Sequence, residues 1–325
     1  MLGPFVHNID PIIGRIGGLY VWWYGLSYTL GFLGTFLWIR RNKFKLAMSD
    51  KEVYDLAIFL AAGVIIGGRI IEVFFYEWGY YGNHIWHITA IWLGGMSTHG
   101  IILGAIIGII IFSRLKHRSF FETSDMLAIA GAYIMGVGRI GNFIDGQIVG
   151  SLTDAWWGVQ FPDLEGYRHP VVLYDGIKNL LLVPFLLLIR RTNPPRGVLT
   201  AHFILWYGFL RIFVDFFREY RTDFLGFPPG QEFNILMTLI GTFLIFWFYR
   251  SKKRIFENTI YLQPNEKKNN DNYDIKNDLW MRRVIFTFFV ILPIIIPSDW
   301  TQDIPSRYGE RHSGLEYSKI YPPIN

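Results

Sequence analysis

The sequence predicts an all-α polytopic membrane protein with seven transmembrane helices, a small periplasmic head and a candidate eighth span near the C-terminus. Three observations lead to this fold class. Hydrophobic residues make up 51% of the 325 residues, and the mean hydropathy is positive at +0.27. Apolar runs recur along the chain, each close to the roughly 20 residues that a helix needs to cross a bilayer. Short clusters of Lys and Arg follow every second run, as the positive-inside rule requires.

Seven apolar runs are predicted to be spans. In chain order they cover residues 17–39, 53–76, 95–112, 125–143, 171–189, 199–217 and 231–249. Residues 85–93 are expected to form a short arm between the second and third spans. The polar residues from about 145 to 170 are expected to form the head.

The basic clusters predict the orientation of the chain. They follow the first, third, fifth and seventh runs, beginning with Arg40 and Arg41 and ending with Arg250 and its neighbours. Loops rich in Lys and Arg stay in the cytoplasm. The N-terminus, the head and the loop after residue 217 are therefore predicted to lie on the other side of the membrane.

The composition changes beyond residue 254, the predicted end of the seven-span domain. Residues 255–283 are rich in Asn, Lys and Asp, which is typical of a polar linker, here in the cytoplasm. Residues 284–297 are apolar but short for a span, so they form either a tight eighth span or an interfacial segment. We favour the span, which places the tail to residue 325 outside.

The composition also limits the chemistry. The chain has no cysteine, so it forms no disulfide or thiolate metal site, and any thiol in its reaction comes from a substrate. The net charge of +5 reflects basic clusters beside apolar runs and indicates no nucleic-acid partner. The histidines lack metal-ligand spacing, and no Walker or Rossmann motif occurs. We therefore predict neither a metal nor a cofactor, and we see no removable signal peptide.

A glycine-rich stretch, residues 136–147, follows the apolar part of the fourth span and contains Arg139 and Asn142. An Arg at that depth is costly in hydrocarbon and is a functional candidate, and its planar group suits a phosphate. The alternative is an Arg that reaches to the interface while the glycines serve helix packing. Arg139 has no acidic neighbour at helical spacing within the membrane, which argues against a purely structural ion pair.

His99 is the candidate general base, because an intramembrane histidine is rare and its pKa suits proton transfer near neutral pH. The alternative is a histidine that joins two helices by a hydrogen bond. Gly100, Gly104 and Gly108 follow it on one face of the third span, and this spacing also favours close helix packing.

Three further sets of polar residues lie within spans. Arg211 and Asp215 share a helix face with Tyr207, and a structural ion pair is the favoured interpretation for Asp215. Arg69 and Glu72 form a similar pair three residues apart. Tyr24 either faces a cavity or is a packed tyrosine with one hydrogen bond.

Several spaced motifs resemble those of the bacterial prolipoprotein diacylglyceryl transferases. Residues 136–146 (GVGRIGNFIDG) resemble the family's signature, and residues 94–100 (GGMSTHG) resemble its His-Gly motif. Further matching stretches occur in the family's order at residues 23–26, 68–69, 168–174 and 207–218. The resemblance covers roughly residues 1–254.

The resemblance implies a seven-span transferase of the bacterial cytoplasmic (inner) membrane with a periplasmic N-terminus. Such an enzyme moves the diacylglyceryl group of phosphatidylglycerol to the lipobox cysteine of a prolipoprotein and releases glycerol phosphate. The implied catalytic residues are His99 as base and Arg139 and Arg211 on the phosphate. The implied substrate-binding positions are Tyr24, Asn142, Asp145, Gln147, Gly100, Arg69 and Tyr207. A catalytically silent lipid-binding or transport protein of the same fold is the alternative.

The chain departs from the family's pattern at several positions. Asp145 and Gln147 stand where the family usually has Asn and Glu, so the amide and the carboxylate have exchanged places. We hypothesise that Asp145 supplies the negative partner that orients Arg139 or the headgroup glycerol. The other departures are Trp22 for His, Val171-Val172 for Ser-Gln, and Asp175 for Glu.

Overall fold

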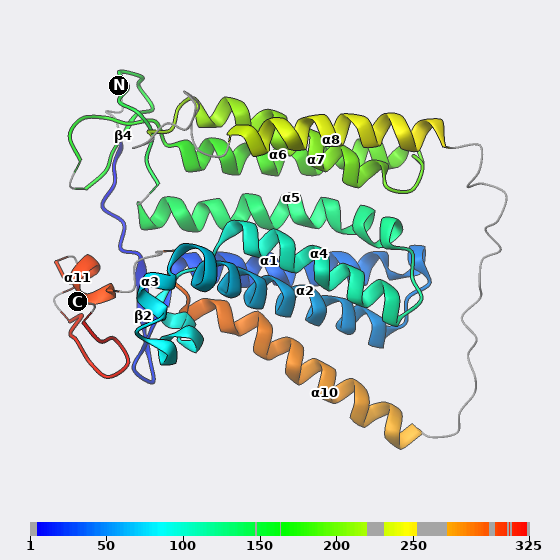
Figure 1. Cartoon of the computed structure of the whole chain (residues 1–325), viewed down its shortest axis with the longest axis horizontal. Coiled ribbons are helices and arrows are strands. Elements are labelled where there is room, and N and C mark those ends of the chain that lie inside the picture. The colour runs from blue at the N-terminus through cyan, green and yellow to red at the C-terminus, as the bar shows by residue number, and fades with distance from the viewer. Residues whose placement is uncertain are drawn as a thin grey trace.

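The protein was analysed as a computed structural model that describes residues 5–146, 148–162, 164–219, 231–251, 272–298, 303–310, 312 and 314–323. In this part of the chain, seven long helices lie side by side and an eighth, α10, runs obliquely across them (Figure 1). The long helices are α1 (Trp23–Asn42), α2 (Asp50–Ile71), α4 (Thr98–Leu115), α5 (Phe120–Asp145), α6 (Val171–Arg191), α7 (Val198–Asp215), α8 (Gln231–Arg250) and α10 (Asn272–Ile291).

The bundle has two distinct ends. The head end, at the left of Figure 1, carries the described residues between α5 and α6, the short helices α3 (Trp78–Tyr81) and α11 (Ile304–Tyr308), and the strands. The basic end, at the right, carries the arginines that close α1, α6 and α8. At the head end, β1 (Phe5–Val6) pairs in parallel with β4 (Val159–Gln160), which ties the N-terminus to the polar residues that follow α5.

Within the described residues, six helices are long and apolar enough to cross a membrane. They are α2 with its π-helical extension to Tyr76, α4, α5, α6, α7 and α8. The prediction of a helical, multi-pass membrane protein is confirmed at this level. The count of seven or eight spans stays a prediction, because α1 is rich in aromatic and small residues and α10 begins with polar ones.

The predicted start of the first span, at residue 17, is wrong. A hairpin of β2 (Ile12–Ile16) and β3 (Leu19–Trp22) precedes α1, which begins at Trp23. Gly17 and Gly18 have φ of 57° and 89° and so form the tight turn between the strands. The apolar residues of β3 continue directly into those of α1, so the sequence pattern resembles one longer apolar run.

Glycines bring α2 and α4 into contact. A Cβ added to Gly100 would fall 2.2 Å from the carbonyl oxygen of Gly67, and one added to Gly104 would fall 1.9 Å from that of Gly63. Backbones approach this closely only where side chains are absent. The packing interpretation of the glycines after His99 is therefore confirmed.

The C-terminal region is more helical than the sequence predicts. The predicted linker, residues 255–283, lies partly outside the described residues, but α10 begins inside it at Asn272 and continues into a 3-10 turn, Leu292–Ile295. The apolar residues from 284 on are therefore the second half of a longer helix. The pattern missed its first half because the polar residues there have partners on α2.

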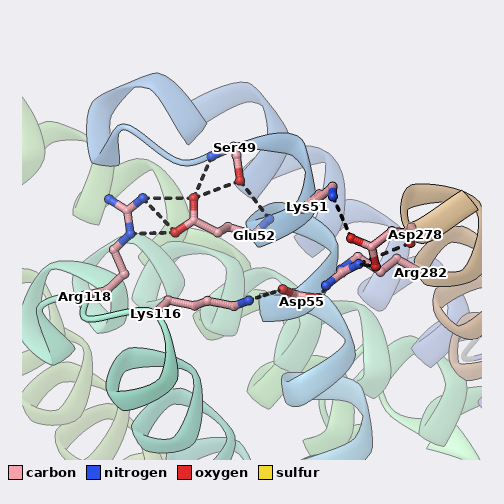
Figure 2. Close-up of polar contacts among 8 residues, drawn as sticks. All are labelled: Ser49, Lys51, Glu52, Asp55, Lys116, Arg118, Asp278 and Arg282. Carbon is pink, nitrogen blue, oxygen red and sulfur yellow. Dashed lines mark hydrogen bonds and ion pairs between the residues drawn. The ribbon is translucent and has the colours of Figure 1, made fainter. Parts of the chain in front are cut away.

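Figure 2 shows these partners at the basic end. Lys51 pairs with Asp278 at 2.6 Å, and Arg282 pairs with Asp55 at 2.6 Å. Lys116, from the loop before α5, also contacts Asp55 at 2.6 Å. The basic-end ion cluster comprises these residues together with Arg118 and Glu52, which pair at 2.7 Å: Lys51, Glu52, Asp55, Lys116, Arg118, Asp278 and Arg282.

Candidate active site

A buried carboxylate stands at the centre of a group of cations near the head end. Asp175 lies one turn into α6, and only 1% of its side chain is exposed. Arg139 Nε of α5 lies 2.6 Å from Asp175 Oδ2, and Lys178 Nζ lies 3.0 Å from Asp175 Oδ1. Arg211 of α7 donates from Nη1 to the same carboxylate. We call Arg139, Asp175, Lys178 and Arg211 the head-end charge cluster.

Close packing of α5 against α6 brings Arg139 to Asp175. A Cβ added to Gly176 would lie 3.1 Å from Arg139 Cβ, and one added to Gly136 would lie 3.2 Å from the Gly176 carbonyl oxygen. The two helices approach because neither glycine has a side chain at the interface. Gly136 of the signature and Gly176 of α6 therefore set the distance at which Arg139 meets Asp175.

Asp215 extends the cluster beyond Arg211. Arg211 Nη2 lies 3.0 Å from Asp215 Oδ1, which is the ion pair one turn apart that the sequence predicts. Asp215 also accepts a hydrogen bond from Asn234 Nδ2 of α8 at 2.9 Å. On the other side, Lys178 Nζ lies 4.0 Å from the ring centre of Tyr207. The predicted Arg211–Asp215 ion pair is therefore confirmed as a contact.

Among the described residues, the charges in this region do not cancel. Three cations, on Arg139, Lys178 and Arg211, face the two carboxylates of Asp175 and Asp215. When ionised, these five side chains together carry one excess positive charge in a poorly solvated environment. An unbalanced charge is costly there, and an anion in reach of the arginines lowers this cost. Guanidinium groups match phosphate oxygens in geometry, so the site suits a phosphate-bearing molecule.

The lack of an acidic neighbour at helical spacing on α5 does not leave Arg139 unpaired, because Asp175 of the next helix contacts it. Spacing along α5 could not reveal a residue on α6. Arg139 Nη1 also donates to Asn142 Oδ1 at 3.2 Å, so the two signature residues lie together. Asp175, and not Asp145, is the carboxylate that contacts Arg139, whereas the other half of the hypothesis, that Asp145 orients the headgroup glycerol, stays a prediction.

His99 lies in the first turn of α4 with its side chain exposed. Its Nδ1 lies 2.9 Å from the Tyr76 hydroxyl, and its ring centre lies 5.6 Å from that of Phe233. Among the described residues, no contact joins His99 to Arg139 or Arg211. However, Phe233 precedes Asn234, which bonds to Asp215. His99 and the charge cluster therefore both reach the first turn of α8.

His169 is another histidine near the head end. Its Nδ1 lies 3.0 Å from the Tyr174 hydroxyl, and burial lowers the pKa of His169 below its ordinary value. This histidine is therefore neutral at pH 7. Among the described residues, no group of three or more His, Asp or Glu side chains is placed to hold a metal ion.

Tyr24 lies against the signature helix. A Cβ added to Gly141 would fall 2.8 Å from Tyr24 Cα, and the Tyr24 ring centre lies 4.9 Å from that of Tyr28. Both tyrosines line an apolar cavity together with residues of α1, α2, α4 and the C-terminal region: Phe32, Val64, Ile65, Met96, Ile101, Pro293 and Ile296. Tyr24 therefore borders this cavity and also packs against Tyr28, and its role in substrate binding stays a prediction.

Two predicted substrate-binding residues serve the scaffold. Arg69 is buried, and its guanidinium donates to backbone carbonyls of the arm and the following loop, among them Ile88 at 2.8 Å and His87 at 2.6 Å. The predicted Arg69–Glu72 ion pair is wrong, because these carbonyls hold the guanidinium instead. Gly100 lies against α2, as described above. Gln147 lies outside the described residues.

Sequence reasoning missed Lys178 and Asn179. Lys178 is buried, its Nζ donates to the fully buried Asn179 Oδ1 at 3.0 Å, and it forms an ion pair with Asp175. A lysine in the middle of the fifth apolar run was the available signal, because an ionisable residue inside a span marks a functional site by default.

Comparisons with known proteins agree on one family. A family model described as prolipoprotein diacylglyceryl transferase matches residues 11–247. The phosphatidylglycerol--prolipoprotein diacylglyceryl transferase of Geobacter sulfurreducens is 39% identical over 243 residues, which are 72% of this chain and 93% of that protein. Proteins of the same name from Nitrosomonas europaea and Legionella pneumophila are 38% and 36% identical, over 81% and 73% of this chain and 98% and 96% of their own lengths.

Proposed function

Because this chain belongs to the prolipoprotein diacylglyceryl transferase family, we propose that it transfers the diacylglyceryl group of phosphatidylglycerol to the lipobox cysteine of a prolipoprotein. In this reaction the cysteine thiol gives its proton to a base, and the thiolate attacks a glycerol carbon of the lipid. The bond from that carbon to the phosphate oxygen breaks. Glycerol phosphate leaves, and a thioether remains on the peptide.

The head-end charge cluster is the observation that supports this proposal most strongly. Its excess positive charge provides an attractive site for the lipid phosphate, with Arg139 and Arg211 as the contacting groups. Charge grows on the leaving phosphate oxygen as the bond breaks, and fixed cations stabilise it there. Lys178 pairs with the carboxylate that both arginines share, and Asn142 accepts a hydrogen bond from Arg139. Tyr24 lines the apolar cavity, beside which the apolar part of the lipid would lie.

His99 is the proposed base for the thiol. Its Nδ1 is engaged by Tyr76, and its Nε2 has no partner among the described residues, which leaves it available to a proton from the peptide. The first turn of α8 connects its position to the charge cluster, so the thiol would approach beside Phe233 while the phosphate rests on the arginines.

The topology follows from the same residues. We place the basic end in the cytoplasm of a bacterium and the head end, the N-terminus and the residues near 145–170 in the periplasm. Residues 1–254 then form the transferase domain of the inner membrane, and α10 forms an eighth span that ends outside. A reporter fused after Tyr249 should be cytoplasmic, whereas one fused after Asn325 should be periplasmic. Labelling of both fusions on one side would contradict the eighth span.

The direct test combines the purified protein with phosphatidylglycerol and a lipobox peptide. We expect release of glycerol phosphate and a gain in peptide mass equal to one diacylglyceryl group. A peptide with serine in place of the lipobox cysteine is the control and should gain nothing. Lipid binding without release would indicate a catalytically silent relative.

His99→Gln tests the base. Glutamine keeps a polar side chain of similar reach but does not titrate, and loss of a positioned base costs about a hundredfold or more in rate. We expect that loss with phosphatidylglycerol binding retained. Full activity of His99→Gln across neutral pH would make the histidine a packing residue.

A further inference from the structure

The chain continues beyond the family match, which ends at residue 247. We call the described residues from α10 onward the C-terminal segment. Its polar beginning is held at the basic end, where Asp278 and Arg282 pair with Lys51 and Asp55 of α2 (Figure 2). Lys116 contacts the same Asp55. These ion pairs set the position of α10 along the axis of α2.

The segment then packs along α1. Thr29 Oγ1 donates to the Val290 carbonyl oxygen at 2.9 Å, and the rings of Phe36 and Phe286 lie 4.3 Å apart between centres. At the head end, a Cβ added to Gly25 would fall 2.0 Å from the carbonyl oxygen of Pro293. The 3-10 turn of the segment therefore lies directly on the α1 backbone next to Tyr24.

The last described residue of this run reaches the end of the signature helix. The Ser298 hydroxyl donates a hydrogen bond to Asp145 Oδ2. Asp145 is fully buried and is the final residue of α5, one turn beyond Asn142 and two turns beyond Arg139. A buried carboxylate is costly unless donors face it, and a hydrogen bond to a charged group is among the stronger ones.

Beyond Ser298, the segment packs on the β2–β3 hairpin. The rings of Trp22 and Tyr308 lie 5.1 Å apart, and the Tyr20 backbone N–H donates to the Tyr321 hydroxyl at 3.0 Å. Ser298 is thus held between two anchored stretches of chain. Trp22 and Asp145 are both positions at which the sequence analysis noted a departure from the family's usual residue, and both contact the C-terminal segment.

We propose that Ser298 is a positioning residue of the transferase site. Its hydroxyl holds the Asp145 carboxylate and thereby the last two turns of α5, from which Arg139 and Asn142 reach the proposed phosphate site. On this proposal, the C-terminal segment contributes to lipid binding and to transfer. This inference rests on the proposed function for its catalytic consequence, but its binding consequence can be measured independently.

The test compares full-length variants purified in detergent. Affinity for phosphatidylglycerol is taken from the lipid-dependent rise in unfolding temperature, and kcat/KM from glycerol phosphate release. Ser298→Ala should bind the lipid about tenfold more weakly and lose about tenfold in kcat/KM, or about 1.4 kcal/mol. Ser298→Thr keeps the hydroxyl and should stay within about twofold of the wild type.

A double-mutant cycle with Asp145→Asn separates positioning from general stability. Without the carboxylate, Ser298→Ala should change lipid affinity by less than about twofold. Thr29→Val is the matched control, because it removes another hydrogen bond of the same segment, the one to the Val290 carbonyl oxygen, and leaves Asp145 with its partner. It should lower the unfolding temperature without weakening lipid binding.

Three results would overturn the proposal: wild-type lipid affinity in Ser298→Ala, an equal effect of Ser298→Ala with and without the Asp145 carboxylate, or equal weakening by Thr29→Val. The wild type reports separately on the proposed function. If it binds phosphatidylglycerol but releases no glycerol phosphate, transfer fails as the function, and the affinity cycle still decides the role of Ser298.

Discussion

The two ends of this bundle use similar residues for different purposes. At the basic end, carboxylates of α2 and α10 meet cations from three parts of the chain (Figure 2). At the head end, one carboxylate, Asp175, is shared by three cations. The exposed fraction of the central carboxylate side chain is 12% for Asp55 and 1% for Asp175.

The difference in burial decides what an unbalanced charge can do. The pairs of the basic end are more exposed than those of the head end, so water and salt screen more of any surplus charge there, and we expect these contacts mainly to join helices. In the buried head-end charge cluster, the surplus is poorly screened and favours an anionic ligand. In this protein, a group of ion pairs therefore indicates a binding site where it is buried and where its cations and carboxylates differ in number.

The largest expected effect comes from removing an arginine at each end. Arg139→Ala should lower transfer about a hundredfold, equivalent to about 3 kcal/mol of barrier stabilisation, while the protein still inserts. Arg118→Ala, its counterpart at the basic end, should stay within about twofold of wild-type activity. Glycerol phosphate release from membranes with matched protein amounts measures both. Equal losses in the two variants would remove the distinction between the ends.

Lys178→Met should have the next largest effect. Methionine has similar length but no charge, so the surplus of the head-end charge cluster disappears while Asp175 keeps both arginines. We expect KM for phosphatidylglycerol to rise about tenfold, or about 1.4 kcal/mol, with a smaller change in kcat. Lys116→Met at the basic end is the control. An unchanged KM in Lys178→Met would show that the surplus charge does not attract the lipid.

Asp55→Asn should affect stability rather than turnover. The substitution leaves Arg282 and Lys116 without their shared carboxylate, and the pair is partly buried, so we expect a loss of about 1–2 kcal/mol in the free energy of unfolding. Activity below the unfolding transition should stay within about twofold. Denaturation in detergent measures the first, and the transfer assay the second. A large loss of kcat in a folded protein would assign the basic end a catalytic role.

Lys51→Ala should have the smallest effect. Both side chains of its pair with Asp278 are 36% exposed, and such pairs contribute about 0–1 kcal/mol. We expect a small fall in unfolding temperature that vanishes at high salt. A loss that persists at high salt would indicate that α10 depends on this contact more than its exposure suggests.

Local patterns predicted the later spans well. The predicted runs 171–189 and 231–249 correspond to α6 (Val171–Arg191) and α8 (Gln231–Arg250). Each has an apolar run that ends in arginine, and both signals lie within the element itself. The hairpin before α1 was missed because two short apolar strands joined by glycines resemble the start of a membrane run.

The first half of α10 was missed for a different physical reason. Asp278 and Arg282 read as residues of a solvated linker, yet each finds a partner more than two hundred residues away on α2. Such a helix gains its stability from tertiary contacts rather than from its own apolar pattern. No window along the sequence contains those partners.

The apolar runs show which segments can enter a membrane, and residue type alone marks Arg139, Arg211 and His99 as functional candidates, because ionisable groups are costly in hydrocarbon. Their partners are visible only in the folded chain: Asp175 contacts both arginines, and Ser298 contacts Asp145. The reason is physical. The cost of a charge in a membrane is a property of one residue, whereas its compensation depends on distances across helices that the order of residues does not state.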